Sequence, residues 1–346
     1  MARRFTIKEI AHQAGLSPAT VDRALHGRDS VRQVTRDRVA AALAELESQY
    51  AASTASGARL TLDIVVQAPN RFSQAVRAAF EAELPLMRPA AIRARFHMAE
   101  RMDEAEIVAR LRAIAKRGSQ GIVLKVPATP AIEAALAGIA RHRIPVVTYV
   151  TDVAAALRLA YVGMENAHAG ATAAYLLSRM MRAPDARVLV TLSSQMFQGE
   201  EMRRHGFTRY LADHAPRLRS VTVSEGFGVN RSTGVLVRQA LETHDDISAV
   251  YSIGGGNAAI LDAFAQAGRD IEVFAAHDLD RTNRQLLAAG KVSFVIHHDF
   301  RQDARRVSLH VMKHWRHVDP ATEIGETAIS IACPVPGIAP LPRTTG

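Results

Sequence analysis

The chain has 346 residues, of which 48% are hydrophobic. A chain of this length and composition is too large for one small module and is ordinary for two or three globular units. Its formal net charge of +9 points toward a polyanionic partner, although many basic proteins bind no nucleic acid. A single cysteine, Cys333, excludes a disulfide framework and a cysteine cluster for zinc, and we expect it to be a small buried residue. The polar amino terminus lacks the apolar run of a secretion signal, and no stretch approaches the length of a membrane span. We therefore expect a cytoplasmic protein with no membrane partner.

The first fifty residues begin with two short helical patterns. Thr6 and Glu9 have the spacing of a capping box, and apolar residues then recur at helical spacing until Gly15 ends the helix. Ser17 is predicted to cap a second helix, with Pro18 at its first position. The tight glycine turn between these helices is typical of a helix-turn-helix unit.

A third helical pattern completes this amino-terminal unit. The second helix is predicted to end at Gly27, and Thr35 is predicted to cap the third helix, with Val34 and Val39 packed as a hydrophobic staple. In a helix-turn-helix unit the amino-terminal end of the second helix enters the major groove of DNA. An ordinary bundle of well-capped helices is the alternative that these residues leave open.

Small and hydroxyl residues replace the helical pattern between residues 48 and 59, which predicts a linker. Beyond it, short β-type runs alternate with amphipathic helices, the pattern that builds parallel sheets with crossover helices. The nine runs are "LTLDIVVQ", "IRARFHM", "GIVLKV", "PVVTYV", "ARVLVTL", "SVTVSEG", "AVYSI", "EVFAA" and "VSFVIHH". Because the pattern breaks near residues 151–166, we expect two doubly wound lobes with a cleft between them.

These patterns predict three parts of the chain. A helix-turn-helix DNA-binding domain occupies residues 1–50, a linker occupies residues 51–59, and a two-lobed domain occupies residues 60–340. The family resemblance given below implies that this last part is an effector-binding and dimerisation domain. The expected segments of the lobes are about 60–161 and 292–318 for the first, and about 162–291 and 319–340 for the second.

Polar and aromatic residues follow several predicted strands, and the carboxyl ends of strands are where doubly wound folds bind ligands. Recognition of a small ligand in such a cleft uses a few polar side chains and an aromatic group over an apolar face of the ligand. The candidate effector-binding residues are Asn70, Phe72, Asp152, Glu165, Phe197, Arg203, Asn257, Asp278 and His298. Helix capping or packing is the alternative role for Asn70, Phe72, Glu165 and Phe197.

Two further motifs do not lead to an enzyme. The glycine-rich turn "GGGN" at residues 254–257 is not followed by a lysine-serine or lysine-threonine pair, and Ala259 stands where a dinucleotide fingerprint needs a third glycine. His297 and His298 are neighbours on a predicted strand and face opposite sides, so they do not predict a metal site. No base or nucleophile can be assembled from the sequence, and we expect no catalytic residue, no cofactor and no metal.

Residues 6–46, "TIKEIAHQAGLSPATVDRALHGRDSVRQVTRDRVAAALAEL", resemble the DNA-binding head of the LacI-type (lactose repressor/galactose repressor) transcriptional regulators. The segments "VTYVTD", "YVGMENAHAG", "EEMRRHGF" and "SIGGGNAAILDAF" resemble recurring segments of the core in that family. The resemblance implies an α/β fold class, with a small all-α helix-turn-helix head plus two doubly wound parallel-sheet lobes of periplasmic-binding-protein type.

The resemblance also implies roles for individual residues. The residues implied to contact base edges are Pro18, Ala19 and Arg23, and those implied to approach phosphates are Thr6, Ser17, Thr20 and His26. Arginine can pair with guanine through two hydrogen bonds, so we expect Arg23 to carry the most direct specificity. In the core, the spacing of Arg203 before Gly206 and Phe207 matches the effector-binding arginine of the family.

The sequence departs from the family pattern at three places. Asp22 stands where the family usually has a serine near the DNA backbone, and a carboxylate repels phosphate. The linker lacks the usual alanine-arginine-x-leucine stretch that wedges a leucine into the minor groove, and Leu60 is expected to belong to the first core strand. Gly256 and Asn257 replace the usual asparagine-aspartate pair, so a common hexose is not required as the effector.

The combined expectation is a sequence-specific transcriptional regulator that is not an enzyme. It is expected to be a homodimer that binds a pseudo-palindromic double-stranded DNA operator and a small sugar, polyol or sugar-acid effector between the lobes. Repression of genes for carbohydrate or polyol uptake or catabolism is the favoured role. The alternatives are a transcriptional activator or a ligand-corepressed regulator of the same fold and, more remotely, a solute-binding protein.

Overall fold

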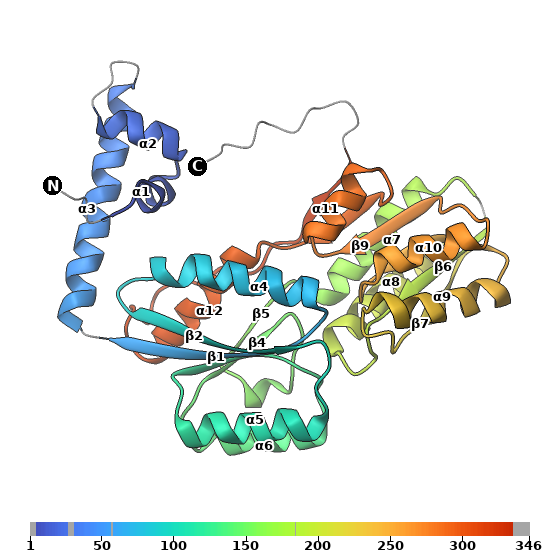
Figure 1. Ribbon diagram of the computed structural model, residues 1–346, viewed down its shortest axis with the longest axis horizontal. Helices are drawn as coiled ribbons and strands as arrows, with labels where there is room; N and C mark the ends of the chain where they lie inside the picture. Colours follow the sequence, from blue (N-terminus) through green and yellow to red (C-terminus); the bar gives the residue numbers. More distant parts are fainter. Residues whose placement is uncertain (1–4, 27–30, 57, 184, 335–346) are drawn as a thin grey trace.

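The computed structural model describes residues 5–26, 31–56, 58–183 and 185–334, with the backbone alone described for residues 48–56. A helical head, whose long third helix leads to the first strand, and two α/β lobes follow one another along the molecule (Figure 1). We call the lobe built on the first sheet the N-lobe and the lobe built on the second sheet the C-lobe.

The head consists of three helices, α1 (Ile7–Ala14), α2 (Pro18–Leu25) and α3 (Gln33–Ser56). The predicted capping box is present, because the Glu9 N–H donates to Thr6 Oγ1 at 3.2 Å and the Thr6 N–H donates to Glu9 Oε2 at 2.6 Å. Gly15 follows α1 with a left-handed φ of 61°, which favours glycine at this position. The buried core of the head consists of Phe5, Ile10, Ala11, Ala14, Val21, Val39, Ala42 and Leu46.

Helix α3 differs from its prediction at both ends. It begins at Gln33, so Thr35 lies inside the first turn and does not cap it, and Val34 is 78% exposed and forms no staple. The helix continues to Ser56 through most of the predicted linker, because residues 33–56 contain no glycine or proline and are rich in alanine. The predicted end of α2 at Gly27 lies outside the described residues.

The N-lobe contains a parallel sheet in the order β2-β1-β3-β4-β5. Its strands are β1 (Arg59–Gln67), β2 (Ala91–Ala99), β3 (Gly121–Lys125), β4 (Val146–Tyr149) and β5 (Ala160–Val162). One face packs against α4 (Asn70–Glu83) and α12 (Phe300–His314), and the other packs against α5 (Glu104–Arg117) and α6 (Pro130–Ala140) (Figure 1). Short 3-10 helices lie at Leu84–Leu86 and Ala155–Leu157.

The C-lobe contains the sheet β11-β10-β9-β8-β6-β7, which is parallel except for β11. Its strands are β6 (Ala186–Thr191), β7 (Leu218–Val223), β8 (Ile247–Ser252), β9 (Val273–His277), β10 (Phe294–His297) and β11 (Ser330–Ala332). One face packs against α7 (Asn166–Met180) and α8 (Gln198–His214). The other packs against α9 (Asn230–Thr243), α10 (Asn257–Gln266) and α11 (Arg281–Ala288).

All nine predicted strands are present, and the two-lobed fold class is confirmed. The sequence pattern missed β5 and β11, which are three residues long and too short for a clear alternation. The assignment of residues 292–318 to the first lobe was wrong for its first part, because β10 pairs with β9 and β11 in the C-lobe. The chain returns to the N-lobe only with α12.

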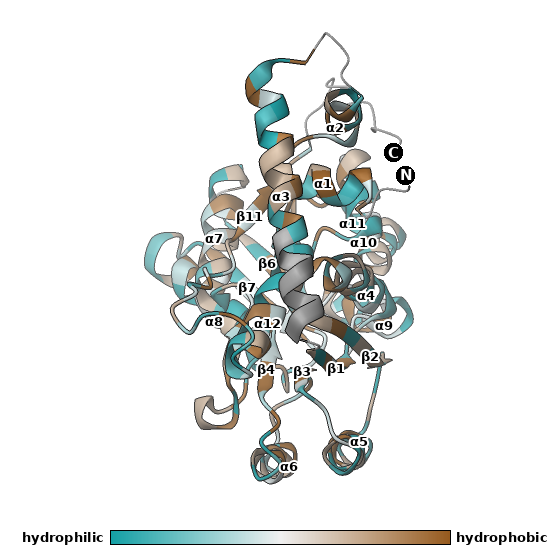
Figure 2. Cartoon of the chain, turned by 90° about the vertical axis from the view of Figure 1, so that its left-hand side faces the viewer, coloured by the Kyte–Doolittle hydropathy of each residue, from teal (hydrophilic) through white to brown (hydrophobic). Residues whose placement is uncertain are grey.

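Three further points concern the course of α3, the exposure of Cys333 and the character of the helices. Figures 1 and 2 both show α3 running past α1 and α2 to the start of β1, where Leu60 is buried in the strand as predicted. Cys333 is exposed, against the expectation of burial, because it follows the short edge strand β11. None of the helices in the described part of the chain has the length and apolar character that crossing a membrane requires.

Helices α7 and α8 of the C-lobe touch through two glycines. A Cβ on Gly170 of α7 would lie 1.9 Å from the carbonyl oxygen of Arg203, and a Cβ on Gly206 of α8 would lie 2.0 Å from that of Ala167. Neither distance is compatible with a side chain, so the two backbones are in direct contact. This contact fixes the position of α8, and with it the side chain of Arg203.

We expect Gly206→Ala to destabilise the protein by about 2 kcal/mol or more, since the added methyl group must push α8 away from α7. Gly138→Ala in α6 is the matched control, because its Cβ would meet only the Arg141 Nη2 atom, at 3.6 Å. Chemical denaturation of both variants measures the difference. Equal stability of the two variants would contradict the tight α7–α8 contact.

Candidate functional site

The amino-terminal end of α2 forms an exposed polar surface on the head. Ser17 caps the helix by accepting from the Thr20 N–H at 3.2 Å, and the two hydroxyl oxygens lie 2.8 Å apart. Arg23 is exposed, and its Nε donates to the carbonyl oxygen of Ala19 at 3.2 Å, which leaves the terminal nitrogens of the guanidinium for another partner. The opposite face of α2 is anchored by Val21, which is fully buried.

The unexpected Asp22 has a partner on its own helix. The Nδ1 atom of His26 lies 3.1 Å from Asp22 Oδ1 and 2.8 Å from the Asp22 carbonyl oxygen. The His26 ring therefore lies against the carboxylate that otherwise opposes a phosphate at this place. The structure therefore brings together Asp22 of α2 and His26 at the carboxyl-terminal cap of that helix, two residues with opposite predicted effects on a nearby phosphate.

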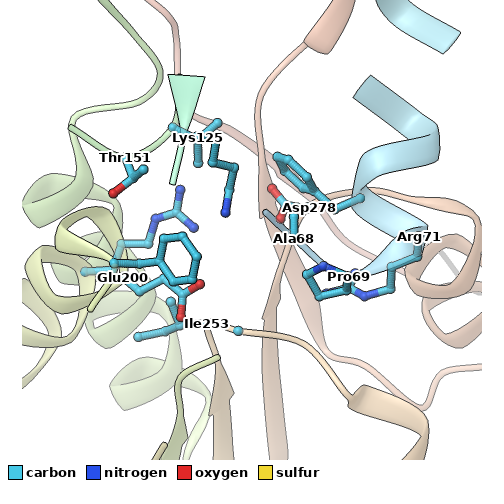
Figure 3. A pocket seen from close by; sticks show the side chains of 13 residues that line it. Ala68, Pro69, Arg71, Lys125, Thr151, Glu200, Ile253 and Asp278 are labelled. Atoms are coloured by element: carbon cyan, nitrogen blue, oxygen red, sulfur yellow. The ribbon is translucent and has the colours of Figure 1, made fainter. Parts of the chain in front are cut away.

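A pocket lies between the two lobes at the carboxyl ends of their strands (Figure 3). The N-lobe contributes the residues after β1, the end of β3 and the residues after β4, and the C-lobe contributes α8 and the residues after β8 and β9. The lining residues are Ala68, Pro69, Arg71, Phe72, Lys125, Val150, Thr151, Phe197, Glu200, Arg203, Ile253, Gly254 and Asp278. This position is where doubly wound folds bind ligands.

Buried polar atoms without hydrogen-bond partners gather at this end of the sheets. They include Gln67 Oε1, Tyr149 Oη, Arg203 Nη2, His277 Nδ1, Asp278 Oδ1 and His298 Nε2. Each such atom costs about 1–3 kcal/mol when it stays unpaired. Asp278 also has a φ of 67°, a left-handed conformation that is strained for a residue with a side chain and is often found at functional sites. The arrangement favours a polar ligand between the lobes.

Lys125 is the buried cation at the end of β3. Its ammonium nitrogen lies 4.3 Å from the centre of the Phe197 ring and 5.3 Å from that of Phe72. Burial lowers the pKa of Lys125 to about 8, against the opposing effect of the Glu200 and Asp278 carboxylates, which raise it.

Four of the nine predicted effector-binding residues line this pocket, namely Phe72, Phe197, Arg203 and Asp278. The structure uses the side chains of most of the others elsewhere. Asp152 accepts from Thr148 Oγ1 at 2.6 Å and pairs with Arg158, and the Glu165 carboxylate caps α7 on the surface.

The remaining three predicted residues lie near the pocket but do not line it. Asn70 is exposed at the start of α4, where its backbone N–H donates to the Glu100 carboxylate. Asn257 is buried between Ser252 and Asn283, to which its side chain is hydrogen-bonded. The His298 ring pairs with Asp303 through Nδ1, while its Nε2 has no partner.

Sequence reasoning missed three charged residues of the pocket, Arg71, Lys125 and Glu200. Lys125 had a detectable signal, because a lysine at the end of the apolar run "GIVLKV" is unusual in a strand that is buried on both faces. Arg71 and Glu200 lie in the first turns of helices, where charged residues are common and carry no such signal.

The two lobes are joined across the pocket by side-chain contacts. Arg71 near the start of α4 forms an ion pair with Asp280, which also caps α11 by accepting from the Asn283 N–H at 2.9 Å. The guanidinium of Arg101 lies 4.2 Å from the centre of the Phe227 ring. These two contacts hold the N-lobe against the C-lobe in this arrangement.

The fold and the pocket define a two-lobed ligand-binding core that follows a helix-turn-helix head. Residues 64–313 match the periplasmic binding protein domain family, and residues 6–50 match the family described as bacterial regulatory proteins, lacI family. The chain therefore belongs to the periplasmic binding protein domain family and has the architecture of the LacI-type regulators, as the sequence resemblance predicted.

Solved structures with the same fold include binding proteins and a regulator. GanP, a glucose-galactose binding protein from Geobacillus stearothermophilus, is 17% identical, with 80% of this chain and 97% of GanP covered and a TM-score of 0.70. A solute-binding protein of an ABC transporter from Agrobacterium vitis, with bound D-fucose, is 16% identical, with 80% and 95% covered and a TM-score of 0.68. A Bacteroides fragilis protein assigned as a LacI transcriptional regulator is 16% identical, with 80% and 97% covered and a TM-score of 0.65. No curated protein matches the chain.

We expect Arg71→Gln to separate the lobes of the ligand-free protein, because it removes a charged contact between them and leaves the α11 cap intact. Small-angle X-ray scattering should show a larger radius of gyration. Arg77→Gln is the control, since Arg77 lies on the same helix and pairs on the surface with Glu81 at 3.7 Å. An unchanged radius in Arg71→Gln would mean that other contacts hold the lobes together.

Proposed function

We propose that the protein is a sequence-specific DNA-binding regulator of transcription, and specifically a repressor of genes for carbohydrate or polyol uptake or catabolism. A small sugar-like effector binds between the lobes and changes the affinity of the head for its operator. The observation that carries this proposal is the presence, in one chain, of an exposed α2 surface in a LacI-type head and a two-lobed core with unpaired buried polar atoms.

In the head, Pro18, Ala19 and Arg23 contact base edges, and the surrounding hydroxyl and histidine side chains approach phosphates. The exposure of Arg23 and the well-capped start of α2 support this assignment. Pro18 and Ala19 offer apolar contact, for instance to a thymine methyl group, whereas Arg23 offers paired N–H donors to guanine.

In the core, the effector contacts both lobes and so favours one relative arrangement of them. A ligand shifts an equilibrium only through unequal affinity for the two states, and a pocket lined from both lobes provides that inequality. The glucose-galactose binding protein and the D-fucose complex, which share the fold, support a small sugar-like ligand.

Effector-promoted DNA binding and transcriptional activation are the alternatives within the same architecture. The lining of the pocket does not determine whether effector binding raises or lowers the affinity for the operator. A solute-binding protein would account for the core but would give no role to the LacI-type head. Operator titration with and without a bound effector decides among these alternatives.

We expect the protein to be a homodimer that binds a pseudo-palindromic site. One eight-residue recognition helix contacts too few base pairs for a specific site, and two heads related by a two-fold axis match two half-sites. Analytical ultracentrifugation at micromolar concentration, with and without an operator selected from random DNA, measures the assembly. A protein that stays monomeric in both conditions would rule out this form of binding.

We expect Arg23→Ala to weaken operator binding by about 1–3 kcal/mol, with a much smaller effect on random DNA, because a lost guanine contact removes specificity. Arg209→Ala is the control, because Arg209 is an exposed arginine of the C-lobe. Fluorescence anisotropy with operator and random duplexes gives both affinities. Equal losses on the two duplexes would make Arg23 a phosphate contact.

A further inference from the structure

Two buried cations in the interlobe pocket have no ion-pair partner. Lys125 is 7% exposed and Arg203 is 2% exposed. Within the described residues, no carboxylate oxygen lies within 4.0 Å of either charged group, whereas Arg71 in the same pocket is paired with Asp280. A buried charge without a partner is costly, so this pair of cations requires an explanation.

Lys125 has hydrogen-bonding capacity that the described part of the chain does not use. Its ammonium group carries three donors, and one of them reaches the Gln67 carbonyl oxygen at 3.3 Å. The side chain points into the pocket (Figure 3), where the Phe197 ring faces the ammonium group. Two N–H donors therefore remain for a ligand.

Arg203 also offers unused donors. Its Nε donates to Asn166 Oδ1 at 2.8 Å, and its Nη2 has no partner. Arg203 and Lys125 line the same pocket from opposite lobes, and both are buried. A negatively charged acceptor would give these groups the direct ion-pair contact that they lack, whereas a neutral hydroxyl would accept a hydrogen bond without one.

The carboxylates of the pocket are arranged differently from these cations. Both oxygens of Glu200 accept from Ser193, at 2.7 Å from the N–H and 2.6 Å from the hydroxyl. Asp278 keeps Oδ1 unpaired and is therefore an acceptor for a ligand hydroxyl. The pocket thus combines donors for an anion with an acceptor for a hydroxyl group.

We propose that the effector is an acidic polyhydroxylated molecule, a sugar acid or a sugar phosphate, whose anionic group lies between Lys125 and Arg203 and whose hydroxyl groups reach Asp278. This inference rests on the proposed function, because it identifies the chemical class of effector for the same pocket. The two sources of the anion, a carboxylate and a phosphate ester, make the same contacts and are separated by the experiment.

The experiment uses the full chain and isothermal titration calorimetry with matched probes. D-gluconate, D-glucuronate and D-galacturonate provide carboxylates, D-glucose 6-phosphate and D-galactose 6-phosphate provide phosphates, and D-glucose, D-galactose and D-glucitol are the neutral counterparts. We expect at least one acid or phosphate to bind tenfold or more tightly than its neutral counterpart. Whether this probe is a carboxylate or a phosphate ester identifies the anionic group of the effector.

Lys125→Met should weaken binding of that probe tenfold or more and change binding of the neutral counterpart less than threefold. Lys125→Arg keeps the charge and should keep the preference for the anion, so it tests the charge if the methionine variant folds poorly. Lys116→Met, at an exposed lysine of α5, is the matched control and should bind like the wild type.

The pH dependence of binding separates a charge contact from a structural role. The charged groups that face Lys125 are Glu200 and Arg203 of α8 and Asp278 after β9. The lowered pKa means that Lys125 is protonated below about pH 8 and loses its charge above it. Affinity for the acidic probe should therefore fall as pH rises through this range in the wild type, and this fall should be absent in Lys125→Met.

Three results would overturn the inference. They are neutral counterparts that bind as tightly as the acids, absence of binding by every acidic probe, and unchanged binding of the acid by Lys125→Met. Failure of the proposed function has a different signature. In that case a probe binds in the pocket with the expected anion preference, but operator affinity is the same with and without it.

Discussion

The constraint on which the structure depends is the cost of burying polar groups without partners. Both sheets end their parallel strands at the same interface, and the side chains placed there include Arg203 and Asp278 of the C-lobe and Lys125 of the N-lobe. Each lobe alone can hydrogen-bond only part of this set, so a ligand that satisfies the rest must contact both lobes. Binding of such a ligand and the relative position of the lobes are therefore thermodynamically coupled.

Helix α4 connects the contact between the lobes to the head. Its first turn carries Arg71, which pairs with the C-lobe, and its last residue is Glu83, which is buried and accepts from Arg305 Nε of α12 at 2.5 Å. Arg305 in turn contacts His12 of α1 at 2.7 Å, and His12 lies 4.0 Å from Glu83. One rigid helix thus contacts the opposite lobe at one end and the head at the other. In the proposed regulator, α4 is therefore the element through which a movement of the lobes would reach α1.

Most of the fold follows from local patterns in the sequence. The capping residues Thr6 and Ser17 marked the starts of the first two helices, and alternation of apolar runs with amphipathic helices marked nine strands. The errors have local causes as well. A segment rich in alanine and other small residues resembles a linker by composition. It continues a helix when no glycine or proline interrupts it, and α3 therefore reaches Ser56. The lobe assignment of β10 depends on strand pairing, which composition does not specify.

The pocket was harder to predict, because a residue at the end of a strand contacts either a ligand or its own neighbours. Asp152 and Asn257 have the residue types and positions of sugar ligands, yet Arg158 and Asn283 use their side chains. Arg203 differs because the α7–α8 glycine contact fixes its backbone, while only its Nε finds an acceptor among the described residues. What distinguishes a binding residue here is the donor or acceptor left over after folding. That remainder depends on distances across the fold, and the sequence alone does not contain them.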